Sequence, residues 1–202
     1  MTSPHPPKND PDDPKPALRQ LYRDRRKAFI AGLAPAARER LERDLADVCK
    51  PLKDRYRHIA SYASVGDEID PRFVEEMLGP HAFPRIDGKN LTFHLSPWAD
   101  LVPGPMGIPQ PPASAPQVTP DLLLVPLLAV TLDGVRLGQG GGYYDRALAA
   151  LRAPDRTNGA PVTAVGLAWE AQIAEFLPKE AWDQRLDMVA TPARLVDCRK
   201  GR

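Results

Sequence analysis

A cluster of glycines in the second half of the chain has the composition of a phosphate-binding loop. Gly138, Gly140, Gly141 and Gly142 stand between an apolar, strand-like segment and a helical segment. Glycine lets backbone N–H groups approach a ligand closely, and the start of a helix attracts negative charge. The loop lacks the Gly-Lys-Ser/Thr of a P-loop and the spacing of a dinucleotide fingerprint. A tight turn that binds nothing is the alternative interpretation.

Charged residues around these glycines could complete a nucleotide site. Arg136 and Arg146 flank the loop, and guanidinium groups suit phosphate. Asp145, in the first turn of the following helix, could hold Mg²⁺ beside phosphate oxygens or, alternatively, complement the helix dipole. Lys15 and Arg19 lie four residues apart on one face of a predicted helix and could reach one phosphate, although such a face is commonly just solvated. The other basic residues of this helix are expected at the surface: Arg23, Arg25, Arg26 and Lys27.

Other kinds of site have little support. The four histidines show no metal-ligand spacing, and no Gly-x-Ser-x-Gly elbow is present. Cys49 and Cys198 are too few for a disulfide framework and fit a reducing cytoplasm. The formal net charge of +1 provides no general field for nucleic acid. No apolar run approaches the roughly 20 residues that span a bilayer. We therefore expect a soluble, cytoplasmic protein without nucleic-acid or membrane partners.

The elements that must position these residues alternate between helix and strand. Helical patterns begin at residue 15 and continue at 36–50, 70–78, 143–151 and 170–176. Strand patterns cover 59–64, 82–86, 91–95, 121–130, 162–169, 186–191 and 195–198. Nine of the ten residues in 121–130 are apolar or proline, which predicts a central strand covered on both faces. The order predicts an α/β fold, with a mainly parallel central sheet and helices on both faces in a Rossmann-like three-layer sandwich.

Proline marks two irregular segments. Of the 24 prolines, six lie before Leu18 and seven lie in residues 103–120. Residues 1–14 contain almost nothing apolar and are expected to form a disordered tail, followed by a single domain over residues 15–202. The segment 96–120 is long for a loop, and we expect an ordered excursion over a site. Trp98 and Met106 in this loop could cover a ligand or simply pack locally.

The glycine loop belongs to a longer recognisable segment. Residues 136–146, Arg-Leu-Gly-Gln-Gly-Gly-Gly-Tyr-Tyr-Asp-Arg, closely resemble the signature of the 5-formyltetrahydrofolate cyclo-ligase family, also called 5,10-methenyltetrahydrofolate synthetases. Weaker similarities extend over residues 15–195: Lys-x-x-x-Arg at 15–19, an acidic strand-end segment at 62–70, Gly-x-x-Gly-Ile at 104–108 and Asp-x-x-x-Thr at 187–191. The chain departs from the family at its proline-rich tail, at Gln110, where an acidic residue is common, and at Leu-Leu-Ala-Val in 127–130.

This resemblance implies a reaction and its participants. The family converts 5-formyltetrahydrofolate and ATP to 5,10-methenyltetrahydrofolate, ADP and phosphate, with Mg²⁺, through a phosphorylated formyl (iminium phosphate) intermediate. The partners would be the small molecules 5-formyltetrahydrofolate and ATP. The protein is expected to be a monomer. A divergent paralogue that binds folate or nucleotide without efficient cyclisation, or an RNA-binding or scaffold protein that uses the basic first helix, are the alternatives.

The resemblance also implies roles for individual residues. ATP would contact Lys15, Arg19, Arg136, Leu137, Gly138, Gln139, Gly140, Gly141, Gly142, Tyr143 and Tyr144. The catalytic group would comprise Arg136, Tyr143 and Asp145. The folate substrate would contact Ala63, Glu68 and Tyr143, with Tyr143 preferred over Tyr144. Asp145 and Asp187 would hold the metal.

Overall fold

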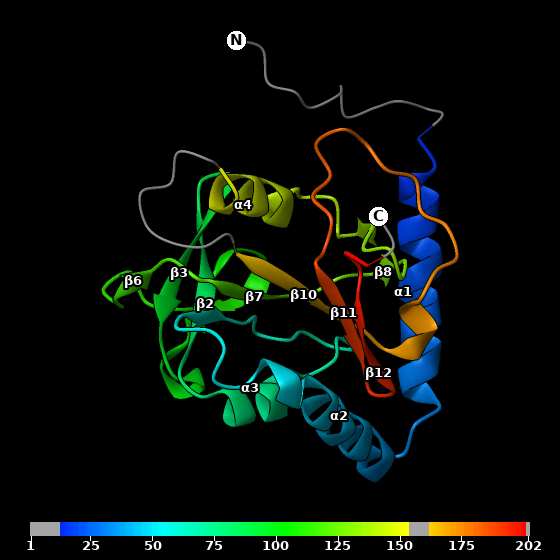
Figure 1. The fold of residues 1–202 in the computed structure, drawn as a ribbon, viewed down its shortest axis with the longest axis horizontal. Helices are drawn as coiled ribbons and strands as arrows, with labels where there is room; N and C mark the ends of the chain where they lie inside the picture. The colour runs from blue at the N-terminus through cyan, green and yellow to red at the C-terminus, as the bar shows by residue number, and fades with distance from the viewer. Residues whose placement is uncertain (1–12, 154–161, 201–202) are drawn as a thin grey trace.

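The computed structural model describes residues 13–153 and 162–200. Its main sheet has eight strands in the order β12-β11-β10-β7-β1-β2-β3-β6 (Figure 1). The five strands from β11 to β2 run parallel, while β12 at one edge and β3 and β6 at the other are antiparallel to their neighbours. The predicted mainly parallel sheet is therefore confirmed. The predicted tail lies outside the described residues except for Asp13 and Pro14.

The elements have the following bounds. The main-sheet strands are β1 (Ile59–Ala60), β2 (His81–Asp87), β3 (Asn90–Leu95), β6 (Gln117–Val118), β7 (Leu122–Val125), β10 (Thr163–Leu167), β11 (Met188–Thr191) and β12 (Arg194–Asp197). Two small sheets pair β4 (Val102–Pro103) with β5 (Pro109–Gln110) and β8 (Ala129–Val130) with β9 (Arg136–Leu137). The α-helices are α1 (Lys15–Ala31), α2 (Pro35–Cys49), α3 (Arg72–Leu78) and α4 (Tyr143–Leu151). The 3₁₀ turns are η1 (Lys50–Leu52), η2 (Trp98–Asp100), η3 (Pro105–Gly107) and η4 (Glu170–Gln172).

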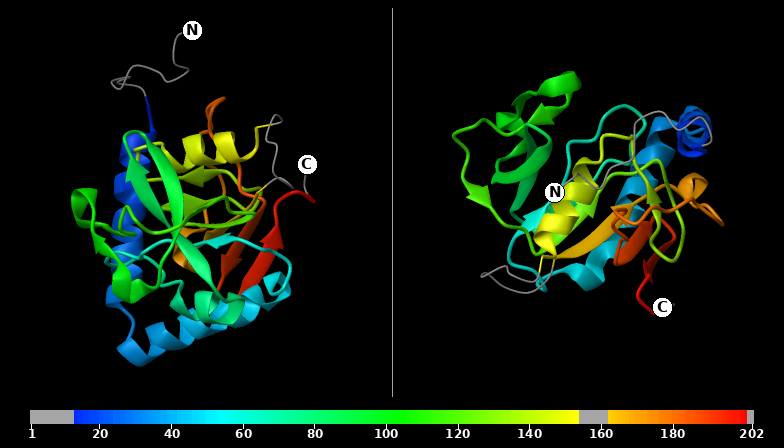
Figure 2. Two further views of the ribbon diagram at one scale, coloured as in Figure 1. Left: turned by 90° about the vertical axis from the view of Figure 1, so that its left-hand side faces the viewer. Right: turned by 90° about the horizontal axis from the view of Figure 1, so that it is seen from above.

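Helices cover both faces of the sheet, as expected. Along β7, Leu122 and Leu124 pack with α2 and α3, whereas Leu123 and Val125 pack with α4, because successive strand residues point to opposite faces. Figure 2 shows α4 on one side of the sheet and α2 with α3 on the other. The described residues contain no helix whose length and apolarity would let it cross a bilayer.

Helix α1 lies against the chain segments that follow the carboxyl ends of the parallel strands. The ring of Phe29 is 5.6 Å from that of Trp169, which comes soon after β10. Tyr22 packs with Leu128 and Leu137 of the β8–β9 region. Residues that follow parallel strands in an open α/β sheet commonly form the ligand site. The first helix of the chain therefore borders the edge where a site is expected.

The predicted strand at 121–130 is too long. Pro126 lies at the break between β7 and β8, since proline offers no N–H to a strand ladder. Beyond it, β8 leaves the main sheet and pairs with β9 in a hairpin. This hairpin delivers the glycine loop to the carboxyl edge of the sheet.

Two other predicted elements are shorter than expected. The helix expected at 170–176 is the three-residue turn η4, because the Gln172 side chain accepts from the Trp169 N–H and donates to the carbonyls of Leu127 and Leu128. The strand expected at 59–64 ends at Ala60. The hairpin turn expected at Asp87-Gly88 is confirmed, with Asp87 paired to Asn90 and Gly88 at a φ of 58°.

Candidate functional site

The glycine loop joins β9 to α4 with its backbone N–H groups free. Gly140 and Gly142 adopt φ angles of 104° and 64°, which favour glycine, and Gly142 caps α4. A Cβ on Gly141 would come within 2.9 Å of the Tyr143 ring. Within the described part of the chain, no N–H of residues 138–142 donates a hydrogen bond. The loop therefore offers unpaired donors at a helix N-terminus, as anion binding requires.

Helix α1 brings basic residues to this loop. The Nε of Arg19 donates to the Gly138 carbonyl at 3.1 Å, and a Cβ on Gly140 would lie 3.4 Å from the Arg19 guanidinium. One turn further, Arg23 donates to the Gln139 side chain at 3.0 and 3.2 Å. The predicted proximity of Arg19 to the glycine loop is thus present, and Arg23 approaches the loop as well.

Lys15 contacts a second segment, between η4 and β11. Its Nζ lies 2.8 Å from Oδ2 of Asp183 and 3.1 Å from Oε2 of Glu180, and its side chain is 9% exposed. The Lys15 ammonium, at the start of α1, is therefore held by two carboxylates of this segment. Sequence reasoning missed both acidic residues, because they lie in an irregular segment whose spacing carries no signal.

Arg136 and Asp145 form an ion pair at the start of α4. The Arg136 Nη1 is 2.9 Å from Oδ1 of Asp145 and donates to the Gln184 carbonyl at 2.8 Å. The same Asp145 oxygen accepts from the Gln184 N–H at 3.0 Å. Only 4% of the Arg136 side chain is exposed. Asp145 is therefore bound to the segment that also carries Asp183.

Asp145 and Asp183 each keep one carboxylate oxygen that could bind a hard cation. Oδ2 of Asp145 and Oδ1 of Asp183 accept no hydrogen bond from the described residues. Groups of three or more His, Cys, Asp or Glu suited to a metal do not occur in the described part of the chain. Mg²⁺ commonly takes only one or two carboxylates, with phosphate oxygens and waters completing its shell. Each of these two carboxylates could therefore supply one ligand oxygen to such an ion.

Asp187 lies elsewhere. Its Oδ2 pairs with Arg152 at 2.6 Å and accepts from the Ala164 N–H at 2.9 Å. Arg152 follows the last turn of α4 and Asp145 lies in the first, and seven residues of helix span about 10 Å. Asp187 and Asp145 therefore share no hydrogen-bond or ion-pair partner among the described residues. The metal role of Asp187 stays a prediction without a supporting contact.

The segment after β1 supplies a largely buried carboxylate. Glu68 accepts from the Val65 N–H at 3.0 Å, and its side chain is 16% exposed. Burial raises the pKa of Glu68, while the Val65 hydrogen bond and the charge of Arg26 oppose this rise. Ala63 is buried in the same segment. A carboxylate in such surroundings can accept hydrogen bonds from a bound ligand.

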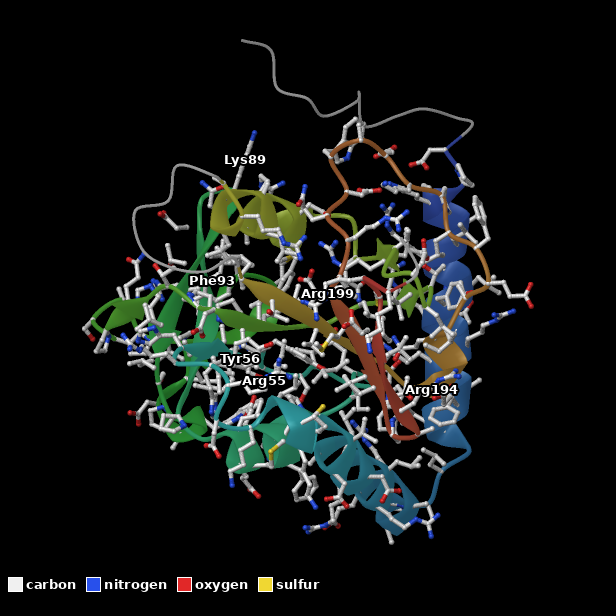
Figure 3. The ribbon with its side chains drawn as sticks, in the orientation of Figure 1. Arg55, Tyr56, Lys89, Phe93, Arg194 and Arg199 are labelled. Carbon is white, nitrogen blue, oxygen red and sulfur yellow. The ribbon has the colours of Figure 1, made fainter. Side chains whose placement is uncertain are left out.

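Tyr144, in the first turn of α4, packs against the apolar core. Burial raises the pKa of Tyr144, and the negative charge of Glu68 adds to the rise while Arg136 opposes it. The Tyr143 ring instead lies 5.1 Å from the Arg146 guanidinium carbon. Arg146 donates to the carbonyls of Gly141 and Lys89, and Lys89 points outward beside α4 in Figure 3.

Arg26 is not a surface residue, contrary to our prediction. Its side chain is 8% exposed and reaches Asp67 at 3.4 Å and Glu68 at 3.8 Å. Arg25 and Lys27 are exposed, as predicted. The error arose because the acidic partners of Arg26 are more than forty residues away in sequence and follow a strand.

The long loop at 96–120 is ordered, and its residues have separate roles. Trp98 packs edge-on against Phe83 at 5.1 Å and donates to Glu75 at 2.5 Å. Met106 is 75% exposed at a turn where its φ is 59°. Gln110 is buried, and its Oε1 accepts from the Ile86 N–H at 3.2 Å. Gln110 therefore ties the loop to β2.

Comparisons with known proteins identify the family. The family model described as 5-formyltetrahydrofolate cyclo-ligase family matches residues 13–192. The 5-formyltetrahydrofolate cyclo-ligase of Escherichia coli (strain K12) is 32% identical over 149 residues, which are 68% of this chain and 79% of that protein. The corresponding protein of Mycolicibacterium smegmatis is 33% identical over 160 residues, or 71% of this chain and 77% of that protein.

Solved structures agree with this relationship. The Aquifex aeolicus 5,10-methenyltetrahydrofolate synthetase has a TM-score of 0.74 and 28% identity, covering 94% of this chain and 95% of that one. A Mycoplasma pneumoniae synthetase, at 21% identity and a TM-score of 0.63, covers 88% of this chain and 98% of that one and shares the fold. The predicted fold and family are confirmed, and the chain belongs to the 5-formyltetrahydrofolate cyclo-ligase family of enzymes.

Proposed function

We propose that this enzyme uses ATP, with Mg²⁺, to cyclise 5-formyltetrahydrofolate to 5,10-methenyltetrahydrofolate, releasing ADP and phosphate. The observation that carries the proposal is the glycine loop, whose free N–H groups lie beside Arg19 on one side and the Arg136–Asp145 pair on the other. Such an arrangement suits a triphosphate, because donors and cations surround a helix N-terminus. The relatives of this chain carry the name of the same reaction.

The chemistry needs ATP because a formyl oxygen is a poor leaving group. The formyl oxygen on N5 attacks the γ-phosphorus, and the bond from that phosphorus to ADP breaks. This yields the phosphorylated formyl intermediate, with positive charge shared by N5 and the formyl carbon. N10 then attacks this carbon, the carbon–oxygen bond breaks, and the departing phosphate takes the N10 proton. The products are the methenyl cation, ADP and HPO₄²⁻, so atoms and charge balance.

The residues of the chain serve this reaction mainly by positioning and neutralising charge. Arg19 and the loop N–H groups would bind the transferring phosphate, and Arg136 would hold Asp145 in place. Asp145 and Asp183 are the carboxylates that fit Mg²⁺, which would neutralise phosphate charge when bound. Lys15, which pairs with Asp183, is placed to share in phosphate binding.

The folate would lie on the Glu68 side of the site. The pterin ring presents N–H donors, and Glu68 is the buried carboxylate that could accept from them. Tyr143 and Tyr144 both open α4 next to the glycine loop, so either side chain could contact the folate near the reacting phosphate. Ala63 would form part of the apolar wall.

The residues that motivated the alternatives have contacts within the domain. Gln110 uses its amide oxygen to tie the loop to β2, a role that does not depend on negative charge. Residues 127–130 are buried in the core. The RNA-binding hypothesis needed a free basic face on α1, yet Lys15, Arg19, Arg23 and Arg26 all have partners within the domain.

A direct assay tests the proposal. Purified protein is mixed with 5-formyltetrahydrofolate, ATP and MgCl₂, and the absorbance of the methenyl product is followed. Product should form with all three present and fail to form when ATP or Mg²⁺ is omitted. Formation without ATP, or no product from folded protein that binds both ligands, would contradict the proposal; the second result would favour the non-cyclising paralogue.

A further inference from the structure

Arg26 is a buried cation at the junction of three segments of the domain. From α1 it reaches Asp67 Oδ2 at 3.4 Å and Glu68 Oε1 at 3.8 Å, both in the segment after β1. Its Nη1 also donates to the Leu127 carbonyl, after β7, at 3.5 Å. One guanidinium group therefore links α1 to the segments that follow two neighbouring central strands.

We propose that Arg26 is a positioning residue that holds the Glu68 carboxylate, ionised and oriented, toward the folate. This inference rests on the proposed function, in which Glu68 contacts the folate. Arg26 lies seven residues after Arg19, two turns further along α1. A single helix would then serve both ends of the site, with Arg19 at the phosphates and Arg26 behind Glu68, the carboxylate that would contact the folate.

The charges around Glu68 single out Arg26. The titratable groups whose charges interact with the carboxylate are Arg26 on α1, Asp67 beside it, Tyr62 after β1 and Tyr144 on α4. Among these groups Arg26 is the only cation. Asp67 and burial both favour protonation of Glu68, and Arg26 opposes it. Without Arg26, Glu68 should hold its proton to a higher pH and lose capacity to accept hydrogen bonds from the substrate.

Arg38 provides a matched control for this effect. From α2, its Nη2 donates to the carbonyl oxygens of Glu68 at 3.0 Å and Gly66 at 3.5 Å, and its Nε pairs with Glu42. It therefore braces the backbone of the same segment without facing the Glu68 carboxylate. Replacing Arg38 loosens the segment, whereas replacing Arg26 loosens it and also removes the cation.

The test compares the pH dependence of kcat/KM for 5-formyltetrahydrofolate in the wild type, Arg26→Met and Arg38→Met. Methionine keeps much of the apolar stem of arginine. In the wild type, kcat/KM should fall at low pH as Glu68 is protonated, which forms the acid limb of the profile. In Arg26→Met this limb should move up by about one pH unit, since a nearby cation shifts a carboxyl pKa by that order. On the acid side of the profile kcat/KM for the folate should fall about tenfold, because one pKa unit changes the ionised fraction of Glu68 tenfold there, with the ATP KM unchanged. In Arg38→Met the limb should stay at its wild-type pH.

Arg26→Lys completes the test, including the case in which Arg26→Met does not fold. Lysine keeps the charge but cannot span all three partners, so the folate KM should rise while the acid limb stays in place. Equal effects of Arg26→Met and Arg38→Met without limb movement, or an Arg26→Lys enzyme with unchanged folate KM, would overturn the proposal. Absence of turnover in the wild type would instead refute the proposed function.

Discussion

Replacing Arg19 by alanine should weaken ATP binding far more than it weakens the fold. In the free enzyme, the half-buried Arg19 side chain donates to the Gly138 carbonyl at 3.1 Å. A single partly exposed hydrogen bond of this kind contributes about 1 kcal/mol to stability. For a chain of this size that amounts to a fall in Tm of roughly 2–4 °C.

The expected effect on ATP is larger. With phosphate in the loop, Arg19 would exchange a carbonyl for an anionic oxygen, and charge-assisted contacts are worth about 1.5–3 kcal/mol. This corresponds to a roughly ten- to hundredfold rise in the ATP KM. The folate KM should change little, because Glu68 belongs to a different part of the site.

The assay is steady-state formation of methenyl product with each substrate varied in turn. Arg40→Ala is the control, since Arg40 is exposed on α2 and makes no hydrogen bond or ion pair with the described residues. If Arg19→Ala and Arg40→Ala gave equally small changes in the ATP KM, Arg19 would only hold the loop, and its assignment to phosphate would be withdrawn.

Three further results are expected. Gly140→Val should raise the ATP KM at least tenfold in a folded protein, because a β-branched residue disfavours a φ of 104°; unchanged ATP affinity would remove the loop from the site. Asp183→Asn should raise the Mg²⁺ concentration needed for turnover, whereas Asp187→Asn should lower thermal stability without changing that requirement, and the reverse pattern would restore Asp187 as metal ligand. The Cys49 thiol, whose pKa burial raises to about 12, should resist alkylation at pH 8 until the protein unfolds, as mass spectrometry can measure.

Features with local causes were predictable from the sequence. The bounds of α4 agree with the pattern at residues 143–151, because the glycines end one element and the apolar spacing defines the next. The hairpin around Gly88 follows from a turn dipeptide that needs a positive φ. The glycine loop itself was recognisable because its residue types are rare outside turns and anion sites.

Features that depend on distant contacts were not. Lys15 and Asp183 are 168 residues apart in sequence, and no local pattern relates them. The burial of Arg26 depends on how α1 packs against the segments that follow β1 and β7, whereas its helical spacing is typical of a solvated face. The apolar neighbours of Pro126 predict a continuous buried strand. In the structure Pro126 instead marks the break after β7, where the chain leaves the main sheet to form the β8–β9 hairpin.

The most direct test of the central claim follows the formyl oxygen itself. If the site transfers the γ-phosphoryl group to that oxygen, 5-formyltetrahydrofolate labelled with ¹⁸O in its formyl group should deliver the label to inorganic phosphate. One labelled phosphate and one ADP should appear for each methenyl product, as measured by mass spectrometry and absorbance. Release of the label into water, or ADP formation without matching product, would contradict the account.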